Sequence, residues 1–202
     1  PADCQAVPGR LEPKVPPPIA QWLEQRPIVW HSTSKENDRS EQRANNGSWM
    51  NPLEAKWTRV LLDRLEFFAS AHAPKHGSGV PVEPIKVVVL TGYSAQRSHL
   101  ENAMQSEPRP HLDVEFHTVD AYQGREADVV VFSVTSSNRQ GKAGFLAERE
   151  RINVALSRAR FGLCLVGDAE YCRSLGGQSA LSEVLEYIQS HPDSCRLKEG
   201  IT

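Results

Sequence analysis

Residues 118–134 read TVDAYQGREADVVVFSV, in which a polar turn is followed at once by an apolar run. The turn carries Gln123, Arg125 and Glu126, and the run from Val129 to Phe132 is apolar throughout. A short continuous apolar run bounded by turn residues is typical of a strand that is buried on both faces. The stretch therefore predicts a core strand with an unusual concentration of polar side chains at its start.

The same kind of apolar run recurs along the chain. We expect strands at five of them, namely IVWH (28–31), KVVVLTG (86–92), DVEFHTV (113–119), DVVVFSVT (128–135) and GLCLVGD (162–168). Continuous rather than alternating runs are what a parallel sheet covered on both faces produces. Helix-length segments separate most of the runs, which predicts an α/β fold with right-handed crossovers. In such sheets, ligands bind beyond the carboxyl ends of the strands.

Helical signals occupy the segments between the strands. Asn51 as N-cap, Pro52 at the first helical position and Glu54 in the first turn make a helix start of the capping-box type. Apolar residues then recur at helical spacing as far as Phe68. Further helices are expected at 94–105, 147–160 and 181–189, and a polar loop at 32–48.

Composition places the chain among ordinary globular domains. It has 202 residues, of which 39% are hydrophobic and 24% charged, enough for one sizeable core. Six of the first eighteen residues are prolines, which predicts an extended segment. We therefore expect a Pro-rich tail or connector at 1–25, one domain at 26–192 and a C-terminal tail at 193–202.

Charge and hydropathy limit the cellular locations and the partners that we expect for the protein. The formal net charge is −2, so no overall basic field attracts nucleic acid, although a local patch can still bind it. No apolar run approaches the roughly 20 residues that a membrane span requires. The four cysteines form no CxxC pair, which favours reduced thiols. We expect an intracellular protein, cytoplasmic or nuclear, without a membrane partner.

Three other chemistries find little support. His72 and His76 have the spacing of a helical metal pair, but Pro74 between them breaks the helix, so we expect no metal site. No GxSxG elbow is present for nucleophilic catalysis. We interpret the four tryptophans as packing residues rather than base-stacking platforms. These residues are Trp22, Trp30, Trp49 and Trp57.

The segment ERERINVALSRAR (148–160) combines a narrow apolar stripe with arginines. On a helix, Arg151 and Arg158 would project along one border of the stripe that is formed by Ile152, Ala155, Leu156 and Ala159. Arginine suits an anion in a neighbouring cleft because its planar fork donates in pairs to phosphate oxygens. The alternative is that these arginines pair with Glu148 or Glu150 on a solvated helix face.

The polar turn of the opening stretch offers a second candidate. Gly124 would let the backbone approach a ligand closely. Glu126 could accept hydrogen bonds from a sugar hydroxyl. The alternative for Glu126 is an ordinary exposed turn carboxylate.

Three segments in this order resemble motifs of the second RecA-like domain of superfamily 1 helicases, in the branch that includes the nonsense-mediated-decay helicase and senataxin. VVVLTGYSAQ (87–96) resembles motif IV, TVDAYQGREADVVVFS (118–133) motif V and GFLAERERINVALSRAR (144–160) motif VI. NPLEA (51–55) resembles the start of the first helix of that lobe. The resemblance runs from about residue 28 to residue 171. It implies a RecA-like three-layer sandwich with a mostly parallel central sheet.

The resemblance implies roles for individual residues on the nucleotide side. Arg158 in SRAR would be the catalytic arginine finger that meets the γ-phosphate of ATP, which is bound with Mg²⁺ mainly by the other lobe. Glu126 would contact the ribose. The remaining residues implied for this side are Gln123, Gly124, Arg125 and Arg151.

The resemblance also implies a face that binds single-stranded DNA or RNA. Its residues would be Thr91, Gly92, Tyr93, Thr118, Val119 and Asp120. Contacts made through main-chain amides and small polar side chains reach the nucleic-acid backbone and carry no base code.

The chain departs from the family pattern in three places. Gly92 stands where the family usually has proline, which is expected to loosen that loop. Where the family often has a triplet that contains one arginine, such as VRS or VRA, this chain has Thr135, Ser136 and Ser137. A cation that would contact the nucleic-acid strand is therefore missing. Glu150 replaces a common basic residue just before Arg151.

No segment matches GxxxxGK[ST], the loop that cradles phosphates. We therefore expect the C-terminal motor lobe of a longer ATP-dependent helicase or translocase, whose partner is the first RecA-like lobe of the same parent chain. By itself this lobe should not hydrolyse ATP. One alternative is a non-catalytic nucleic-acid-binding or scaffolding module with a degenerate helicase fold. Another is an unrelated α/β domain.

Overall fold

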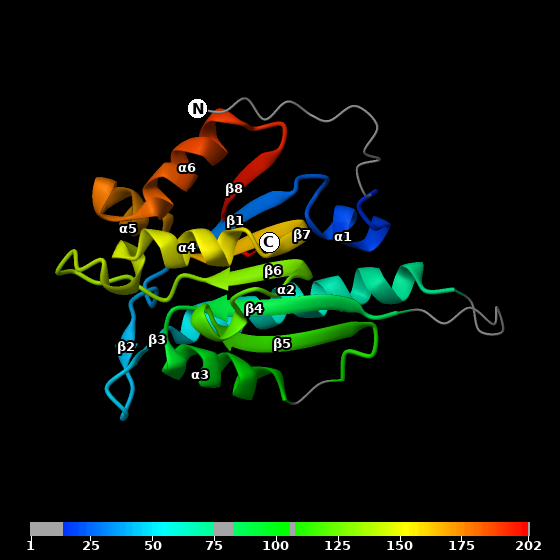
Figure 1. The fold of residues 1–202 in the computed structure, drawn as a ribbon, viewed down its shortest axis with the longest axis horizontal. Coiled ribbons are helices and arrows are strands. Elements are labelled where there is room, and N and C mark those ends of the chain that lie inside the picture. The colour runs from blue at the N-terminus through cyan, green and yellow to red at the C-terminus, as the bar shows by residue number, and fades with distance from the viewer. Residues whose placement is uncertain (1–13, 75–82, 106–107, 202) are drawn as a thin grey trace.

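A six-stranded parallel sheet forms the centre of the molecule (Figure 1). The structure is a computed structural model that describes residues 14–74, 83–105 and 108–201. The strands lie in the order β5-β4-β6-β7-β1-β8. Their bounds are β1 (Ile28–Ser32), β4 (Ile85–Thr91), β5 (Leu112–Thr118), β6 (Ala127–Ser133), β7 (Ala159–Gly167) and β8 (Cys195–Glu199). The predicted α/β, RecA-like arrangement is confirmed.

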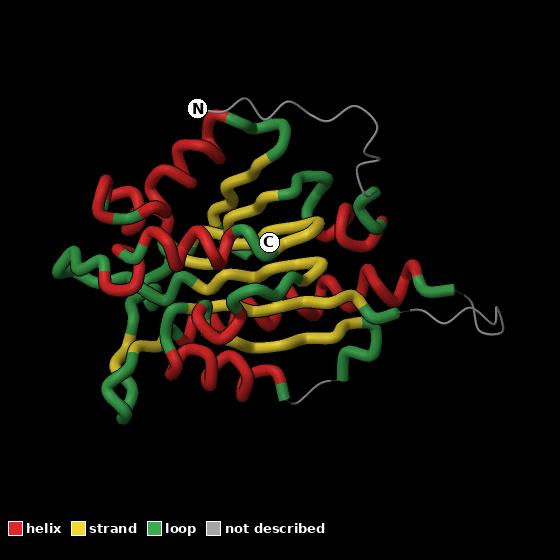
Figure 2. Tube along the Cα trace, viewed as in Figure 1, coloured by secondary structure: helices red, strands yellow, loops and turns green. Residues whose placement is uncertain are grey.

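Helices cover both faces of the sheet, so the molecule has three layers (Figures 1 and 2). One face packs against α1 (Pro17–Trp22), α2 (Pro52–His72) and α3 (Ser94–Met104). The other packs against α4 (Arg149–Leu156), α5 (Ala169–Ser174) and α6 (Ala180–Ser190). Short 3₁₀ turns are η1 (Asp120–Tyr122), η2 (Gly144–Ala147) and η3 (Gly176–Gln178).

The two hydrophobic cores explain why the strands are apolar throughout. Along β6, Val129 and Val131 belong to the core beneath α2, whereas Val130 and Phe132 belong to the core beneath α4. Successive side chains of a strand point to opposite faces, and here both faces of the sheet are buried under helices. A continuous apolar run is therefore the sequence that this position requires.

Helix α2 begins as predicted. The Asn51 side chain accepts a hydrogen bond from the Glu54 N–H at 3.2 Å, and Pro52 occupies the first helical position. The reciprocal half of the capping box is absent, because the Asn51 N–H donates to Gln96 Oε1 at 2.7 Å instead. The Glu54 carboxylate accepts instead from the Asn51 side-chain amide, at 3.2 Å.

The predicted helix at 147–160 is wrong at both ends. The chain forms η2 up to Ala147, and α4 ends at Leu156. Residue 159 already pairs with Ala127 in the sheet, and the Arg158 carbonyl accepts a hydrogen bond from the Ala127 N–H at 3.1 Å. The need to enter β7 ends the helix, so Arg158 lies in a turn rather than on the helical border that carries Arg151.

Three segments contain more structure than the sequence predicts. Residues 1–25 include α1, whose Trp22 Nε1 donates to the Leu61 carbonyl at 2.8 Å. Residues 193–202 include β8, which pairs with β1 along its whole length. The polar loop holds a hairpin of two short strands, β2 (Gln42–Arg43) and β3 (Trp49–Met50).

Several predicted packing roles can be checked within the described ranges. Trp22, Trp30 and Trp57 are buried, whereas Trp49 is half-buried beneath the Arg43 guanidinium. The three described cysteines, Cys164, Cys172 and Cys195, are buried free thiols. Cys4 and His76 lie outside the described residues.

Membrane and metal features were also predicted to be absent. Across residues 14–74, 83–105 and 108–201, no helix is long and apolar enough to cross a membrane. In the same ranges no cluster of three or more His, Cys, Asp or Glu side chains could hold a metal ion.

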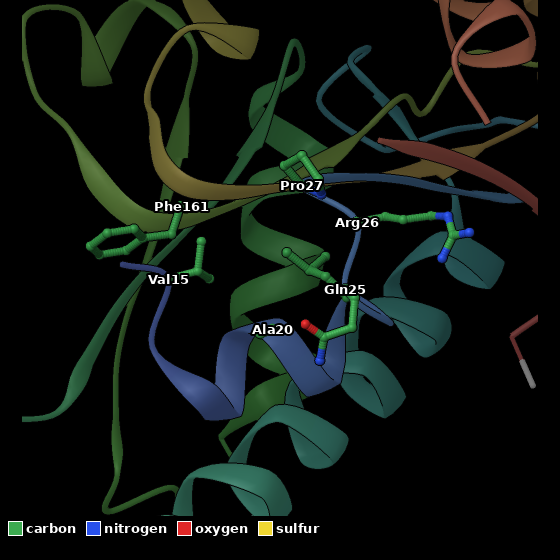
Figure 3. Close-up of a pocket in the computed structure, with 7 residues that line it drawn as sticks. Val15, Ala20, Gln25, Arg26, Pro27 and Phe161 are labelled. Atoms are coloured by element: carbon green, nitrogen blue, oxygen red, sulfur yellow. The ribbon is translucent and has the colours of Figure 1, made fainter. Parts of the chain in front are cut away.

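A small apolar pocket of about 130 Å³ lies beside α1 (Figure 3). Its walls come from the helix and from the start of β7, and they include Val15, Ala20, Leu23, Pro27 and Phe161. None of the sequence-predicted site residues lines it. The candidate site therefore lies elsewhere.

Candidate functional site

The sequence-predicted site residues fall into two groups at opposite ends of the sheet. Thr91 and Thr118 are the last residues of β4 and β5, and they are paired in register at the carboxyl end. Glu126 and Arg158 immediately precede β6 and β7, at the amino end. Because β5 and β6 are parallel, the connection 119–126 must return from one end to the other. This connection is the polar turn of the opening stretch.

Arg158 contacts the polar turn at the amino end. Its Nη1 donates to the Arg125 carbonyl at 3.4 Å, and its Nε donates to the Val154 carbonyl at 2.9 Å. A third bond, 2.8 Å long, joins its Nη2 to Ser157 Oγ. These bonds fix a half-buried guanidinium between the end of α4 and the turn. Two residues 33 positions apart in the sequence are therefore brought into contact.

The turn itself is open to solvent. Gln123, Gly124 and Glu126 are exposed, and the Tyr122 hydroxyl donates to the Glu126 carbonyl at 3.1 Å to hold the turn in place. Gly124 has φ +80°, a left-handed conformation that favours glycine. A Cβ at this position would meet no atom within 4 Å. Backbone conformation, and not crowding, accounts for this glycine.

Arg125 lies in the turn but directs its charge elsewhere. Its Nη2 donates to both oxygens of Glu115 at 2.7 Å, and the guanidinium lies 4.5 Å from the centre of the Tyr122 ring. Hydrogen bonds from His117 and then Arg125 hold the pKa of Glu115 below its usual value. The charge of Arg125 is thus paired with edge strand β5.

Arg151 is not brought to the Arg158 group. Its Nε donates to Asp120 Oδ1 at 2.8 Å, a second short bond joins Nη2 to Oδ2, and its guanidinium lies 4.8 Å from the centre of the Phe145 ring. The bond to Asp120 raises the pKa of Arg151 above its usual value. A residue predicted for the nucleotide side therefore pairs with one predicted for the strand side.

The predicted strand face, meaning the residues expected to bind single-stranded DNA or RNA, is only partly accessible. Thr91 is buried, and its hydroxyl hydrogen-bonds to Thr135 Oγ1 at 2.9 Å. Val119 is buried in the core beneath α4. Neither side chain can touch a strand in this conformation, because both are enclosed by protein. The contacts still open to a ligand are those of Gly92, Tyr93, Thr118 and Asp120.

The loop at Gly92 is packed, which corrects the expectation that it would be loose. A Cβ at Gly92 would lie 2.2 Å from Cγ of Phe145, so the ring occupies the space that a side chain would need. The Phe145 N–H also donates to the Tyr93 hydroxyl at 3.0 Å. Phe145 therefore fixes this loop. Nothing in the local sequence around Phe145 indicated this role.

Sequence reasoning also missed a buried carboxyl group beneath the strand face. Glu54 is fully buried, and it accepts from Ser133 Oγ at 2.5 Å and from the Thr135 N–H at 2.8 and 3.0 Å. Burial raises its pKa to about 8. Thr135 has φ 69°, a costly conformation for a β-branched residue, which the bonds to Glu54 hold in place. A Glu in the first turn of a helix reads as a cap, so the sequence carried no signal of this role.

A polar pocket of about 270 Å³ opens beside this network, at the carboxyl ends of β1 and β7. Asp168 organises it by accepting from Ser34 Oγ at 2.8 Å, Ser137 Oγ at 2.7 Å and Arg39 Nε at 2.9 Å. Arg39 and Arg139 both line the pocket. Cations are therefore present near Ser137 although the family's arginine is missing.

Comparison with known proteins places the chain. It matches the AAA domain family over residues 7–170. It is 32% identical over 173 residues to DNA polymerase alpha-associated DNA helicase A of Saccharomyces cerevisiae, covering 84% of this chain and 22% of that protein. It is 36% identical over 145 residues to the regulator of nonsense transcripts 1 homolog of Neurospora crassa, covering 70% and 12%.

A third relative is the ATP-dependent helicase NAM7 of Saccharomyces cerevisiae, at 33% identity over 155 residues, or 75% of this chain and 14% of that protein. The chain thus spans less than a quarter of the length of these three relatives. The HK97 bacteriophage large terminase matches at TM-score 0.47 and 10% identity, over 91% of this chain and 37% of that one, a likeness too weak to carry an argument.

The motif order, the parallel sheet and these relatives lead to one assignment. The chain belongs to the AAA domain family and has the RecA-like domain type of the C-terminal region of superfamily 1 helicases, in the branch that contains regulator of nonsense transcripts 1.

Proposed function

We propose that the chain is the C-terminal motor lobe of an ATP-dependent nucleic-acid helicase or translocase, with Arg158 as its arginine finger. One observation carries the proposal. Three arginines of motif VI pair with carboxylates, Arg149 with Glu183, Arg151 with Asp120 and Arg160 with Asp128. Within the described residues Arg158 has no such partner, and its bonds go to two carbonyls and one hydroxyl.

An arginine whose charge is not neutralised is suited to an incoming anion. Bonds to neutral groups fix the guanidinium without cancelling its charge, and the same face presents the exposed Glu126 carboxylate. A cation for phosphate oxygens beside an acceptor for ribose hydroxyls fits a nucleoside triphosphate. ATP with Mg²⁺, bound mainly by a first RecA-like lobe, would supply the phosphoryl group. Arg158 would stabilise the charge that develops on it.

The opposite end of the sheet would contact single-stranded DNA or RNA. Gly92, Tyr93, Thr118 and the main chain of Asp120 supply amides, a phenol and a hydroxyl, which suit the sugar-phosphate backbone. We expect binding without sequence preference. Because this lobe lacks a P-loop, we also expect no ATP turnover from the 202-residue chain.

The test is Arg158→Ala in the intact protein that joins this domain to its P-loop lobe. We expect ATP turnover to fall by roughly 10³- to 10⁵-fold, as for other arginine fingers. Affinity for single strands should stay within about threefold, because Arg158 lies at the other end of the sheet. Arg160→Ala is the matched control, since Arg160 is exposed and paired with Asp128.

Unchanged turnover in Arg158→Ala would refute the finger assignment. If the intact wild-type protein bound single strands but hydrolysed no ATP, the alternative of a non-catalytic nucleic-acid-binding module would hold instead.

A further inference from the structure

Phe145, in motif VI, packs against the motif IV loop and against Arg151. On one side its ring fills the space above Gly92, where a Cβ would come within 2.2 to 2.6 Å of three ring atoms. It also meets the Tyr93 ring edge-on, with centroids 6.1 Å apart. A movement of the loop 92–93 toward Phe145 would therefore have to displace the ring, because the atoms are close-packed.

Arg151 lies against the same ring and extends to the motif V turn. Its guanidinium stacks 4.8 Å from the ring centre and forms two hydrogen bonds with Asp120. The Arg151 side chain is 39% exposed and that of Asp120 is 58% exposed, so solvent and ligands can reach the pair. A pocket of about 160 Å³ is lined by both residues.

Helix α4 connects Arg151 to Arg158. Arg151 lies in its first turn, and the Val154 carbonyl, one turn further on, accepts the bond from Arg158 Nε at 2.9 Å. Ile152 and Ala155 anchor the helix in the core between them. The same short helix therefore carries both Arg151 and the carbonyl that orients Arg158.

The Asp120 carboxylate contacts Arg151 in the way that a phosphate group could. Its carboxylate receives the paired donors of an arginine fork, the geometry with which arginine also binds phosphodiester oxygens. The pair lies beside the strand face proposed above. A bound strand would bring its own anions to this fork, and a phosphate would then compete with Asp120 for Arg151. Arg151 would then have two alternative partners, which is what a switch requires.

We propose that Arg151 transfers from Asp120 to a backbone phosphate when a single strand binds, and that Phe145 and α4 convey this transfer to Arg158. The inference rests on the proposed function, since it assumes that Arg158 is the finger. It moves Arg151 from the nucleotide side to the strand side. It makes Asp120 the counterion of Arg151 and Phe145 a positioning residue.

The first test measures strand binding without nucleotide, so that it is independent of Arg158. Fluorescence anisotropy with labelled oligo-dT and oligo-U, over a series of salt concentrations, gives the slope of log affinity against log salt. In the intact protein, Arg151→Gln should reduce that slope by about one, the loss of one phosphate contact. Arg151→Lys should retain the slope, and Asp120→Asn should tighten binding.

Arg149→Gln is the matched control, because Arg149 lies in the same helix, is similarly exposed and pairs with Glu183. It should leave the slope unchanged. Equal slopes for the wild type, Arg151→Gln and Arg149→Gln would overturn the proposed transfer, as would an absence of strand binding at low salt.

The second test concerns the connection to Arg158. Phe145→Leu should retain the salt slope but lower the ratio of strand-stimulated to basal ATP turnover about tenfold, within the range of coupling that single residues carry. If Phe145 only packs the core, the variant will lower the melting temperature and leave that ratio unchanged, which would overturn its positioning role.

A nucleotide-free measurement separates this inference from the proposed function. In ¹⁵N spectra of arginine Nε groups of the 202-residue chain, Phe145→Leu should shift the signals of both Arg151 and Arg158. A shift confined to Arg151 would overturn the connection, whatever the turnover assays give. If both signals shift but Arg158→Ala leaves turnover unchanged, the connection stands and the finger assignment fails.

Discussion

The two ends of the central sheet satisfy their polar groups in opposite ways. At the carboxyl end, Glu54, Ser133 and Thr135 are buried and satisfy one another, so that end holds a shape without help. At the amino end, Glu126 is exposed and Arg158 is half-buried without a carboxylate partner among the described residues. The difference indicates that the buried polar groups at the carboxyl end are satisfied within the chain, whereas the amino end leaves charged groups that a ligand outside the chain could pair.

The largest effect expected from this contrast is the loss of turnover in Arg158→Ala, at the amino end. The next largest concerns stability and comes from the buried carboxyl group at the other end. Burial raises the pKa of Glu54 from its ordinary value of 4.5 to about 8. Its contribution is therefore fully present below pH 4.5 and is lost as the pH rises through 8, because the unfolded state releases this proton first.

A second buried group opposes Glu54 over part of that range. Burial lowers the pKa of His31 to about 4, so its effect makes stability rise with pH up to its ordinary value of 6.5. The clean window is thus pH 6.5 to 8. Over it we expect urea unfolding to show a loss of about 2 kcal/mol in the wild type. Glu54→Gln, which cannot ionise, should flatten this fall, and equal slopes for the two proteins would contradict the burial of an ionisable Glu54.

The packing around Phe145 predicts a somewhat smaller effect. Gly92→Ala would place a methyl group inside the ring, so Phe145 must shift, at a cost of about 1 to 2 kcal/mol. Chemical denaturation measures this loss. Gly177→Ala is the control, because a Cβ at Gly177 meets no atom within 4 Å and the residue is exposed. Similar stabilities for the two alanine variants would show that the ring does not occupy this space.

The smallest effect concerns the ion pair that holds Arg125 on β5. Glu115→Gln should release this arginine toward the open turn, where its charge can attract nucleotide. We expect the ATP concentration for half-maximal turnover of the intact protein to fall about two- to threefold, the size expected of an exposed ion pair. Glu101→Gln, which breaks the exposed pair with Arg97, should have no effect. A rise in that concentration would mean that Glu115 supports the site rather than competing with it.

Local sequence was sufficient for the frame of this domain. The apolar runs predicted five of the six strands of the sheet, because a strand buried on both faces leaves a mark that does not depend on its neighbours. Asn51 and Pro52 predicted the start of α2 for the same reason, since a cap acts within one turn. Arg158 and Glu126, which the motif resemblance implies on the nucleotide side, both lie at the amino end of the sheet, and their roles stay a prediction.

Long-range pairing was beyond local signals. Periodicity could not show that Ala159 pairs with Ala127 in the sheet and so ends α4. It also could not show that Arg125 forms an ion pair with Glu115, or Arg151 with Asp120. Strand β8 reads CRLKE, whose charged residues alternate as on an edge, and no apolar run marks it. The burial of Glu54 depends on Ser133 and Thr135, about 80 residues away in sequence.

Segments from early and late in the described chain meet at one edge of the sheet. Strand β8 covers the edge of β1, and Glu24, just after α1, pairs with Arg196 and Lys198 across that junction. A recombinant fragment trimmed to residues 26–192 would lose both elements and leave the edge of β1 with unpaired backbone groups. Bare strand edges recruit further chains. Anyone who expresses this domain should therefore retain residues 14–201, or expect the trimmed protein to aggregate before its chemistry can be measured.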